Sequence, residues 1–277
     1  MKNNSKNWFT SQKMPWGKVL LLAVAAAVVT AGLKLIPFLD DTSFQDIAVN
    51  LECWILFAVF IIVNCTKWYE AAAKTFVFFL VSQPLIYLIQ VPFSALGFQL
   101  FGYYRYWFIV TLLTIPGSVI AFQVRRRDWL SVAVLSVATV FLAVMAAVYF
   151  WDVRAGFPRH LLSLCFCIAL AFFLAFTLLD RRAHRVVAVI LILAALAVSL
   201  PLLKPIDVQT LVPGDGSWTY AVEGDSVAGI AAEPDGAFRI SAGRDGISTV
   251  TFTNERGEVK EYMVTVSGGG IFINEIE

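Results

Sequence analysis

The chain has 277 residues, of which 59% are hydrophobic and only 15% charged, whereas soluble domains carry charge at about a quarter of their positions. This composition excludes an ordinary soluble domain and indicates a membrane protein. The net charge of +1 hides two unequal parts: residues 1–204 carry 17 Lys and Arg against 8 Asp and Glu, a net of +9, and residues 205–277 carry 4 against 12, a net of −8. Because the basic residues form short clusters between apolar stretches, a nucleic-acid binder is also excluded.

Seven apolar stretches are long enough to cross a bilayer as helices. A hydrocarbon core of about 30 Å needs about 20 helical residues, because no backbone polar group can face lipid unpaired. The sequence therefore predicts an all-α transmembrane domain of about seven helices over residues 19–203, with spans at 19–38, 47–65, 75–93, 106–124, 129–151, 161–179 and 186–203.

Lys and Arg alternate between the two sides of these spans. Twelve lie in the arm 1–18 and in the second, fourth and sixth loops, including Arg125, Arg126 and Arg127, and five lie near the opposite ends. Cationic loops are retained in the cytoplasm. We expect residues 1–18 to form a cytoplasmic basic arm, and an odd number of spans then places the C-terminal region outside.

Residues 206–277 have the pattern of an all-β domain. Short segments of β-branched and aromatic residues are separated by turn signals such as Asn254-Glu255-Arg256-Gly257. The expected strands are 206–212, 217–222, 227–232, 237–241, 246–253, 259–266 and 271–276. In the segments 248–253 and 261–266 alternate side chains would face one core, as a two-sheet sandwich requires.

The segments 236–240, 246–252 and 261–266 resemble the bacterial immunoglobulin-like domains of surface proteins. The resemblance covers about residues 206–266 and none of the membrane part. It implies a small extracytoplasmic sandwich that binds or assembles, and it implies no catalytic residue, because such domains share core spacing and differ in what they bind. The residues after Val266 depart from the usual ending, and an additional edge strand is one role for them.

One polar cluster is expected inside the membrane part. An ionisable group within a span costs at least about 2.5 to 3.5 kcal/mol at the bilayer centre and needs a partner or a purpose. Glu52 lies in the second span beside Asn50, and Gln90 and Arg105 lie at the outer ends of neighbouring spans. The favoured interpretation is a structural ion pair of Glu52 with Arg105 or Lys34; the alternative is an outer-leaflet pocket for a charged headgroup or a lipid-linked sugar.

A second candidate site comprises the prolines of the third and fourth spans. Gln83 and Pro84 fall near the middle of one span and Pro116 and Gly117 near the middle of the next. Two adjacent broken helices form the midplane site of many transporters. Proline is also ordinary in membrane helices, so helix kinking and packing is the favoured interpretation.

The sequence lacks the motifs of several enzyme classes. There is no H-E-x-x-H pair, no G-x-S-x-G and no phosphate-binding G-x-x-x-x-G-K-S/T loop. We interpret the four cysteines as small apolar residues that fill space. Cys165 and Cys167 point about 200° apart on a helix and cannot bind the same metal ion. We expect no catalytic residue, no metal and no cofactor.

These observations favour a multi-pass protein of the bacterial plasma membrane whose external immunoglobulin-like domain binds or assembles at the cell envelope without catalysis. Its partners would be the lipid bilayer and another membrane or envelope protein. The alternatives are a transporter, or a subunit of one, with its site at Gln83, Pro84, Pro116 and Gly117, and an enzyme that acts on a lipid-linked substrate with Glu52.

Overall fold

The computed structural model describes residues 8–39, 42–126, 128–154, 160–214, 217–223, 227–233, 236–267 and 270–276. The chain divides into two compact units, Met1–Ala147 with Arg159–Ser199 and Val148–Pro158 with Leu200–Glu277. The first unit holds most of the helices, and the second holds all the strands together with the last turns of two helices. A helical bundle followed by a small all-β domain is the fold class that the sequence predicts.

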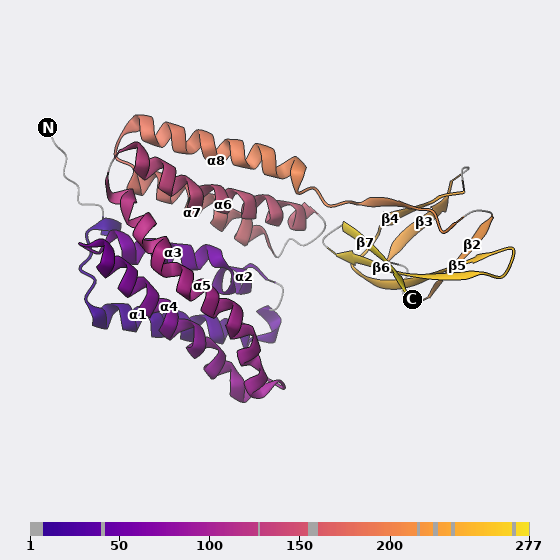
Figure 1. The fold of residues 1–277 in the computed structure, drawn as a ribbon, viewed down its shortest axis with the longest axis horizontal. Coiled ribbons are helices and arrows are strands. Elements are labelled where there is room, and N and C mark those ends of the chain that lie inside the picture. Colours follow the sequence, from indigo (N-terminus) through magenta and orange to yellow (C-terminus); the bar gives the residue numbers. More distant parts are fainter. Residues whose placement is uncertain are drawn as a thin grey trace. The chain divides into compact units, whose positions relative to one another are not determined.

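Over the residues that the structure describes, eight α-helices and several short 3-10 helices form the helical part (Figure 1). The α-helices are α1 (Trp16–Lys34), α2 (Ser43–Val49), α3 (Leu51–Val63), α4 (Trp68–Gln90), α5 (Phe101–Ala121), α6 (Trp129–Arg154), α7 (Leu161–Leu178) and α8 (Arg182–Leu202). The 3-10 helices are η1 (Trp8–Thr10), η2 (Pro37–Leu39), η3 (Val91–Phe93), η4 (Gly97–Leu100) and η5 (Phe122–Arg126). Six of the α-helices, all but α2 and α3, are long and apolar enough to cross a membrane alone.

The second predicted span is a bent pair of helices. Helices α2 and α3 meet at Asn50 at an angle of 46°, and the backbone of Asn50 is extended, with φ −79° and ψ 163°. Neither helix is long enough alone, since α2 has 7 residues and α3 has 13. Together they rise about 30 Å at 1.5 Å per residue, which matches the thickness of a hydrocarbon core.

Hydrogen bonds at both ends of this pair show that it runs the length of the bundle. At the start of α2, the Ser43 hydroxyl accepts a bond of 3.0 Å from the backbone N–H of Ser163, in the first turn of α7. Just after α3, the Asn64 side chain donates to the Phe9 carbonyl at 2.8 Å. The Phe9 ring contacts Phe173, toward the end of α7, with 5.1 Å between ring centroids. The bent pair therefore runs alongside α7 from its first turn to about Phe173.

Two apolar cores hold the helices together, and α3 contributes to both. One core contains buried residues of α1, α3 and α4, such as Ala27, Trp54 and Phe78. The other contains residues of α6, α7 and α8 together with Val63 at the end of α3. Figure 1 shows the matching groups of helices, with α6 to α8 gathered apart from α1, α4 and α5.

The predicted N-terminal arm is folded against the bundle over its described residues. Phe9 and Met14 are 6% and 4% exposed and belong to the two cores. The buried Lys74 side chain donates to the Met14 carbonyl at 2.5 Å and pairs with Glu70. Helix α1 also begins at Trp16 rather than at residue 19. Residues 1–7 of the arm, and Arg127 of the fourth loop, lie outside the described residues.

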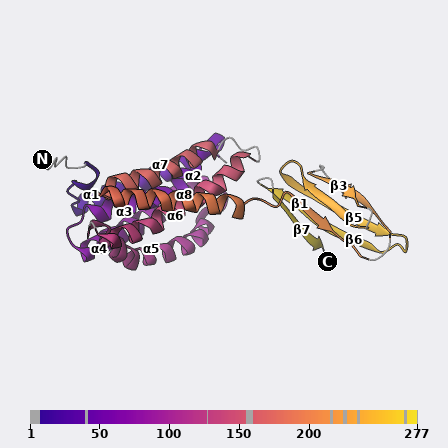
Figure 2. The ribbon, with the colours of Figure 1, turned by 90° about the horizontal axis from the view of Figure 1, so that it is seen from above.

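The strands form two antiparallel sheets. In chain order they are β1 (Val208–Leu211), β2 (Trp218–Glu223), β3 (Ala228–Ala232), β4 (Phe238–Ala242), β5 (Gly246–Asn254), β6 (Val259–Ser267) and β7 (Gly270–Ile276). The strand orders are β1-β4-β3 and β2-β5-β6-β7. Strands β1 and β7 lie side by side (Figure 2), where the Ile271 N–H donates to the Ile206 carbonyl at 2.8 Å. All seven predicted strands are present, and the segment after Val266 supplies the edge strand β7.

The two sheets enclose one apolar core, as the alternation in the sequence predicts. In β5 the buried side chains are Ser248, Val250 and Phe252, and in β6 they are Tyr262, Val264 and Val266. Constant immunoglobulin domains have strands A, B, E and D in one sheet and C, F and G in the other. The order found here differs, so what the two share is the packing of two sheets.

The matched residues Phe252 and Ile247 of β5 test this core. Phe252 is fully buried, 4.8 Å from the Phe238 ring, whereas Ile247 is 62% exposed. We expect Phe252→Ala to lower the unfolding free energy of the β domain by about 3 to 5 kcal/mol and Ile247→Ala to change it by less than about 0.5 kcal/mol. Hydrogen exchange of the β5 and β6 amides in the full chain measures both. Equal effects would contradict the assignment of the core face.

Candidate functional site

A mainly apolar cavity with a few polar side chains, the Arg105 cavity, opens among several helices of the helical unit. Its volume is about 740 Å³. The residues that line it come from α1, α2, α3, α4, α5 and η4 and comprise Thr30, Lys34, Val49, Trp54, Gln83, Ile86, Tyr87, Gln90, Leu100, Gly102, Tyr103, Arg105, Tyr106, Trp107 and Ile109. This arrangement combines aromatic walls with a few polar groups, as ligand sites usually do.

Both charged residues in the described lining of this cavity, Lys34 and Arg105, are basic. Lys34 already has an interaction partner. Lys34 is the last residue of α1 and Arg105 lies in the second turn of α5, while Gln90 ends α4. Arg105 forms no ion pair or hydrogen bond with the residues that the structure describes. Its guanidinium group is therefore available to a ligand.

Two buried donors face the cavity from deeper positions. Gln83 and Trp54 are each 2% exposed, and neither Gln83 Nε2 nor Trp54 Nε1 has a hydrogen-bond partner among the described groups. The Trp54 indole is held by the rings of Phe78, Phe79 and Trp107, at centroid distances of 5.9, 5.7 and 6.4 Å. Because buried donors are almost always satisfied, these two atoms indicate a place for an acceptor.

The cavity joins residues from both predicted clusters. Gln90 and Arg105 of the first cluster and Gln83 of the second line it together. Asn50 lies at the bend between α2 and α3, and Glu52 is buried in the first turn of α3; neither lines the cavity. A Glu52–Arg105 ion pair is absent from the described contacts.

The prolines of the third and fourth spans do not interrupt their helices, as the less favoured transporter interpretation would require. Helix α4 continues from Trp68 to Gln90 through Pro84, and α5 continues from Phe101 to Ala121 through Pro116. Gln83, Pro84, Pro116 and Gly117 therefore do not supply the unwound backbone of a midplane site. Membrane helices tolerate proline because neighbouring groups satisfy the carbonyl that it leaves. The break lies instead at Asn50, in the second span.

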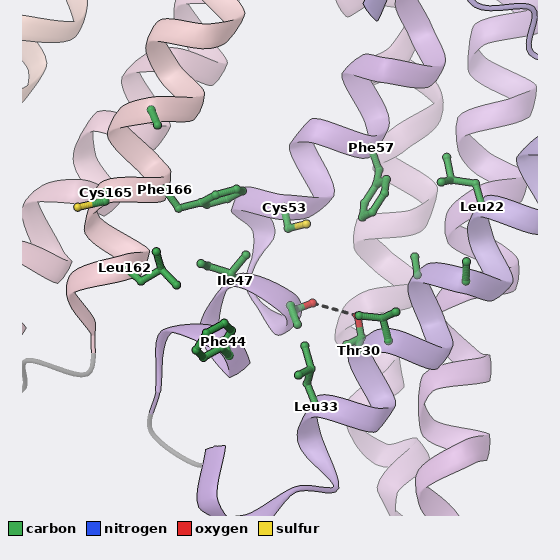
Figure 3. Close-up of a pocket in the computed structure, with 15 residues that line it drawn as sticks. Leu22, Thr30, Leu33, Phe44, Ile47, Cys53, Phe57, Leu162, Cys165 and Phe166 are labelled. Atoms are coloured by element: carbon green, nitrogen blue, oxygen red, sulfur yellow. Dashed lines mark hydrogen bonds between the residues drawn. The ribbon is translucent and has the colours of Figure 1, made fainter.

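A second cavity, of about 620 Å³, is almost wholly apolar. Figure 3 shows Leu22 and Leu33 of α1 on one side and Phe166 of α7 on the other, with Cys53 of α3 between them. The Thr30 hydroxyl closes one edge by donating to the Ala48 carbonyl at 3.2 Å. With no charged group among the described residues that line it, this cavity suits a hydrocarbon chain.

A hydrogen-bonded group that the sequence did not reveal joins α2 to α7. Asp46 Oδ2 lies 2.6 Å from His160 Nδ1 and accepts a bond of 3.1 Å from the Ser163 hydroxyl. The Asp46 and His160 side chains are 18% and 16% exposed. Because Ser163 donates to the carboxylate and not to the imidazole, it is not arranged as a nucleophile activated by a histidine base. The group fastens the start of α2 to the start of α7.

Metal ligation has no support in the described residues, among which no three His, Cys, Asp or Glu come together as a possible metal site. Cys65 and Cys167 are buried, Cys53 is half-buried and Cys165 is exposed. The cysteines therefore contribute apolar surface to the bundle.

A double-mutant cycle tests the interaction between Asp46 and His160. Asp46→Asn and His160→Gln each remove the charge-assisted bond while keeping a side chain of similar size. We expect the two losses of unfolding free energy to be non-additive by about 1 to 2 kcal/mol, because the residues are in direct contact. Unfolding in mixed micelles, followed by circular dichroism, gives the four values. Additive losses would show that the two side chains do not interact.

The chain was compared with protein-family models, with curated proteins and with solved structures, and no match was found. The comparisons therefore assign no family, substrate or partner. The geometry of the described residues alone carries the functional argument.

Proposed function

We propose that the chain is a seven-span protein of the bacterial plasma membrane that presents an immunoglobulin-like domain outside the cell to bind another envelope protein. The proposal assigns the domain a binding role without catalysis. It places the N-terminal segment in the cytoplasm and residues 206–277 on the outer side.

The outer face of the four-stranded sheet carries this proposal. Ile247, Met263, Phe272 and Ile276 are 62%, 40%, 60% and 38% exposed. Ile247 pairs with Thr265 and Thr265 with Phe272, so these side chains occupy one row across β5, β6 and β7. Met263 occupies the next row on the same face. Large exposed apolar side chains gathered on one face of a small domain, here interspersed with Thr265 and Asn274, support a protein-binding role for that face.

The positions of basic residues in the loops support the proposed orientation of the chain in the membrane. Cationic loops remain on the cytoplasmic side. Arg125 and Arg126 lie in η5, which follows α5, and Arg181 and Arg182 lie at the start of α8. Counting the bent pair as one span gives seven crossings. The acidic C-terminal region then emerges on the other side.

The two alternative functions gain less support. A midplane transporter site needs unwound helices, but α4 and α5 are continuous. An enzyme that uses Glu52 as acid or base needs this carboxylate to face substrate. Glu52 lines neither of the two large cavities.

Site-specific photo-crosslinking tests the binding face. A photoreactive residue in place of Thr249, which pairs with Met263, should give an adduct with a partner protein in native membranes. Ile247→Ser and Phe272→Ser should each reduce that adduct at least fivefold by removing apolar contact area. Val208→Ser, which changes an exposed valine on the other sheet, should leave it unchanged. An adduct equally strong in all three variants would refute this face as the binding surface.

A further inference from the structure

We propose that the Arg105 cavity is a binding site for the headgroup of an anionic phospholipid. The phosphodiester would lie at Arg105, and the ester carbonyl oxygens of the glycerol region would lie deeper, at Gln83 and Trp54. This assignment concerns the helical unit and is independent of the role proposed for the β domain.

The upper part of the cavity has the charge that a phosphate requires. Lys34 and Arg105 are its only charged groups among the described lining residues, and both are positive. The guanidinium group of Arg105, which has no partner among the described residues, can bind phosphate oxygens through charge-assisted hydrogen bonds. The same part of the cavity has Gln90 and the aromatic residues Tyr103 and Tyr106, and tyrosine favours the headgroup level of a bilayer.

The lower part of the cavity has the donors that ester carbonyls require. Gln83 precedes Gln90 by seven residues on α4, which places it about 10 Å farther along the helix axis. Its amide nitrogen and the indole nitrogen of Trp54 are buried without a partner in the described structure. An unpaired hydrogen-bond donor is unfavourable in an apolar environment. An ester carbonyl oxygen, which only accepts hydrogen bonds, would satisfy each of these two donors.

The burial of the two donors distinguishes a lipid from free phosphate. A free phosphate ion that moved to Gln83 and Trp54 would lose its hydration in a mainly apolar interior, whereas a neutral ester carbonyl can enter there at little cost. A phospholipid carries its ester oxygens below the phosphate, on the hydrocarbon side, and so matches both levels at once. The volume of about 740 Å³ lies within the range of sites for small organic ligands.

Native mass spectrometry of the full chain in detergent measures this binding. Phosphatidylglycerol is titrated against the wild type, with phosphatidylcholine and inorganic phosphate as separate arms. We expect phosphatidylglycerol to bind at least tenfold more tightly than phosphatidylcholine, and millimolar phosphate not to displace it. Arg105→Gln should weaken phosphatidylglycerol binding about tenfold, because it removes a charge-assisted bond. Arg154→Gln removes an exposed arginine that does not line the cavity and should change the affinity less than twofold.

Gln83→Leu separates ligand binding from a structural role. Removing a buried amide donor without a partner should raise the unfolding temperature of the lipid-free protein, while it weakens phosphatidylglycerol binding about threefold to tenfold. A structural role for Gln83 would instead lower the unfolding temperature.

Four results would overturn the proposal. They are equal affinity for phosphatidylglycerol and phosphatidylcholine, displacement of the lipid by inorganic phosphate, equal effects of Arg105→Gln and Arg154→Gln, and unchanged lipid affinity in Gln83→Leu. Displacement by phosphate would assign the cavity to the free anion.

Discussion

The structure of the helical unit depends on the pairing of backbone N–H and C=O groups wherever the chain crosses lipid. Hydrocarbon offers no hydrogen bonds, so each crossing must be helical or be shielded by protein. This requirement keeps α4 and α5 continuous through Pro84 and Pro116. It also explains where the chain can bend. Asn50 interrupts the second span beside Glu52, which is 2% exposed, so the open backbone there is next to the buried interior of the bundle.

Much of the architecture could be predicted from the sequence because two periodicities are strong. Long apolar runs mark the helices, and alternation in β5 and β6 marks the buried face with Val250, Phe252 and Val264. The bend at Asn50 could not be predicted, since asparagine and proline both weaken a helix locally and tertiary contacts decide which one breaks it. The packing of Phe9 onto Phe173 was equally hidden, because the short segment before α1 has no periodicity of its own.

In the candidate site, too, features that depend on local sequence could be predicted, and features that depend on tertiary packing could not. Gln90 and Arg105 could be placed at one membrane face because both lie at span ends. Gln83 was assigned to a different site, because its depth and direction depend on how α4 packs against α3 and α5. Trp54 could not be recognised as a donor from the sequence, since an unpaired indole N–H is costly only when burial removes its water. The contact of Asp46 with His160 joins residues 114 positions apart, a distance over which no sequence pattern acts.

The number of crossings is the central claim, and the bent pair of α2 and α3 decides it. Labelling with a membrane-impermeant maleimide on intact spheroplasts tests it most directly, in a chain whose four native cysteines are replaced by alanine. Single cysteines are introduced at Ser11, in the exposed segment before α1, and at Glu255, in the turn between β5 and β6. Seven crossings predict that Glu255→Cys is labelled in intact spheroplasts and Ser11→Cys only after lysis. Labelling of both positions on the same side would contradict the account, because the bent pair would then not cross the membrane.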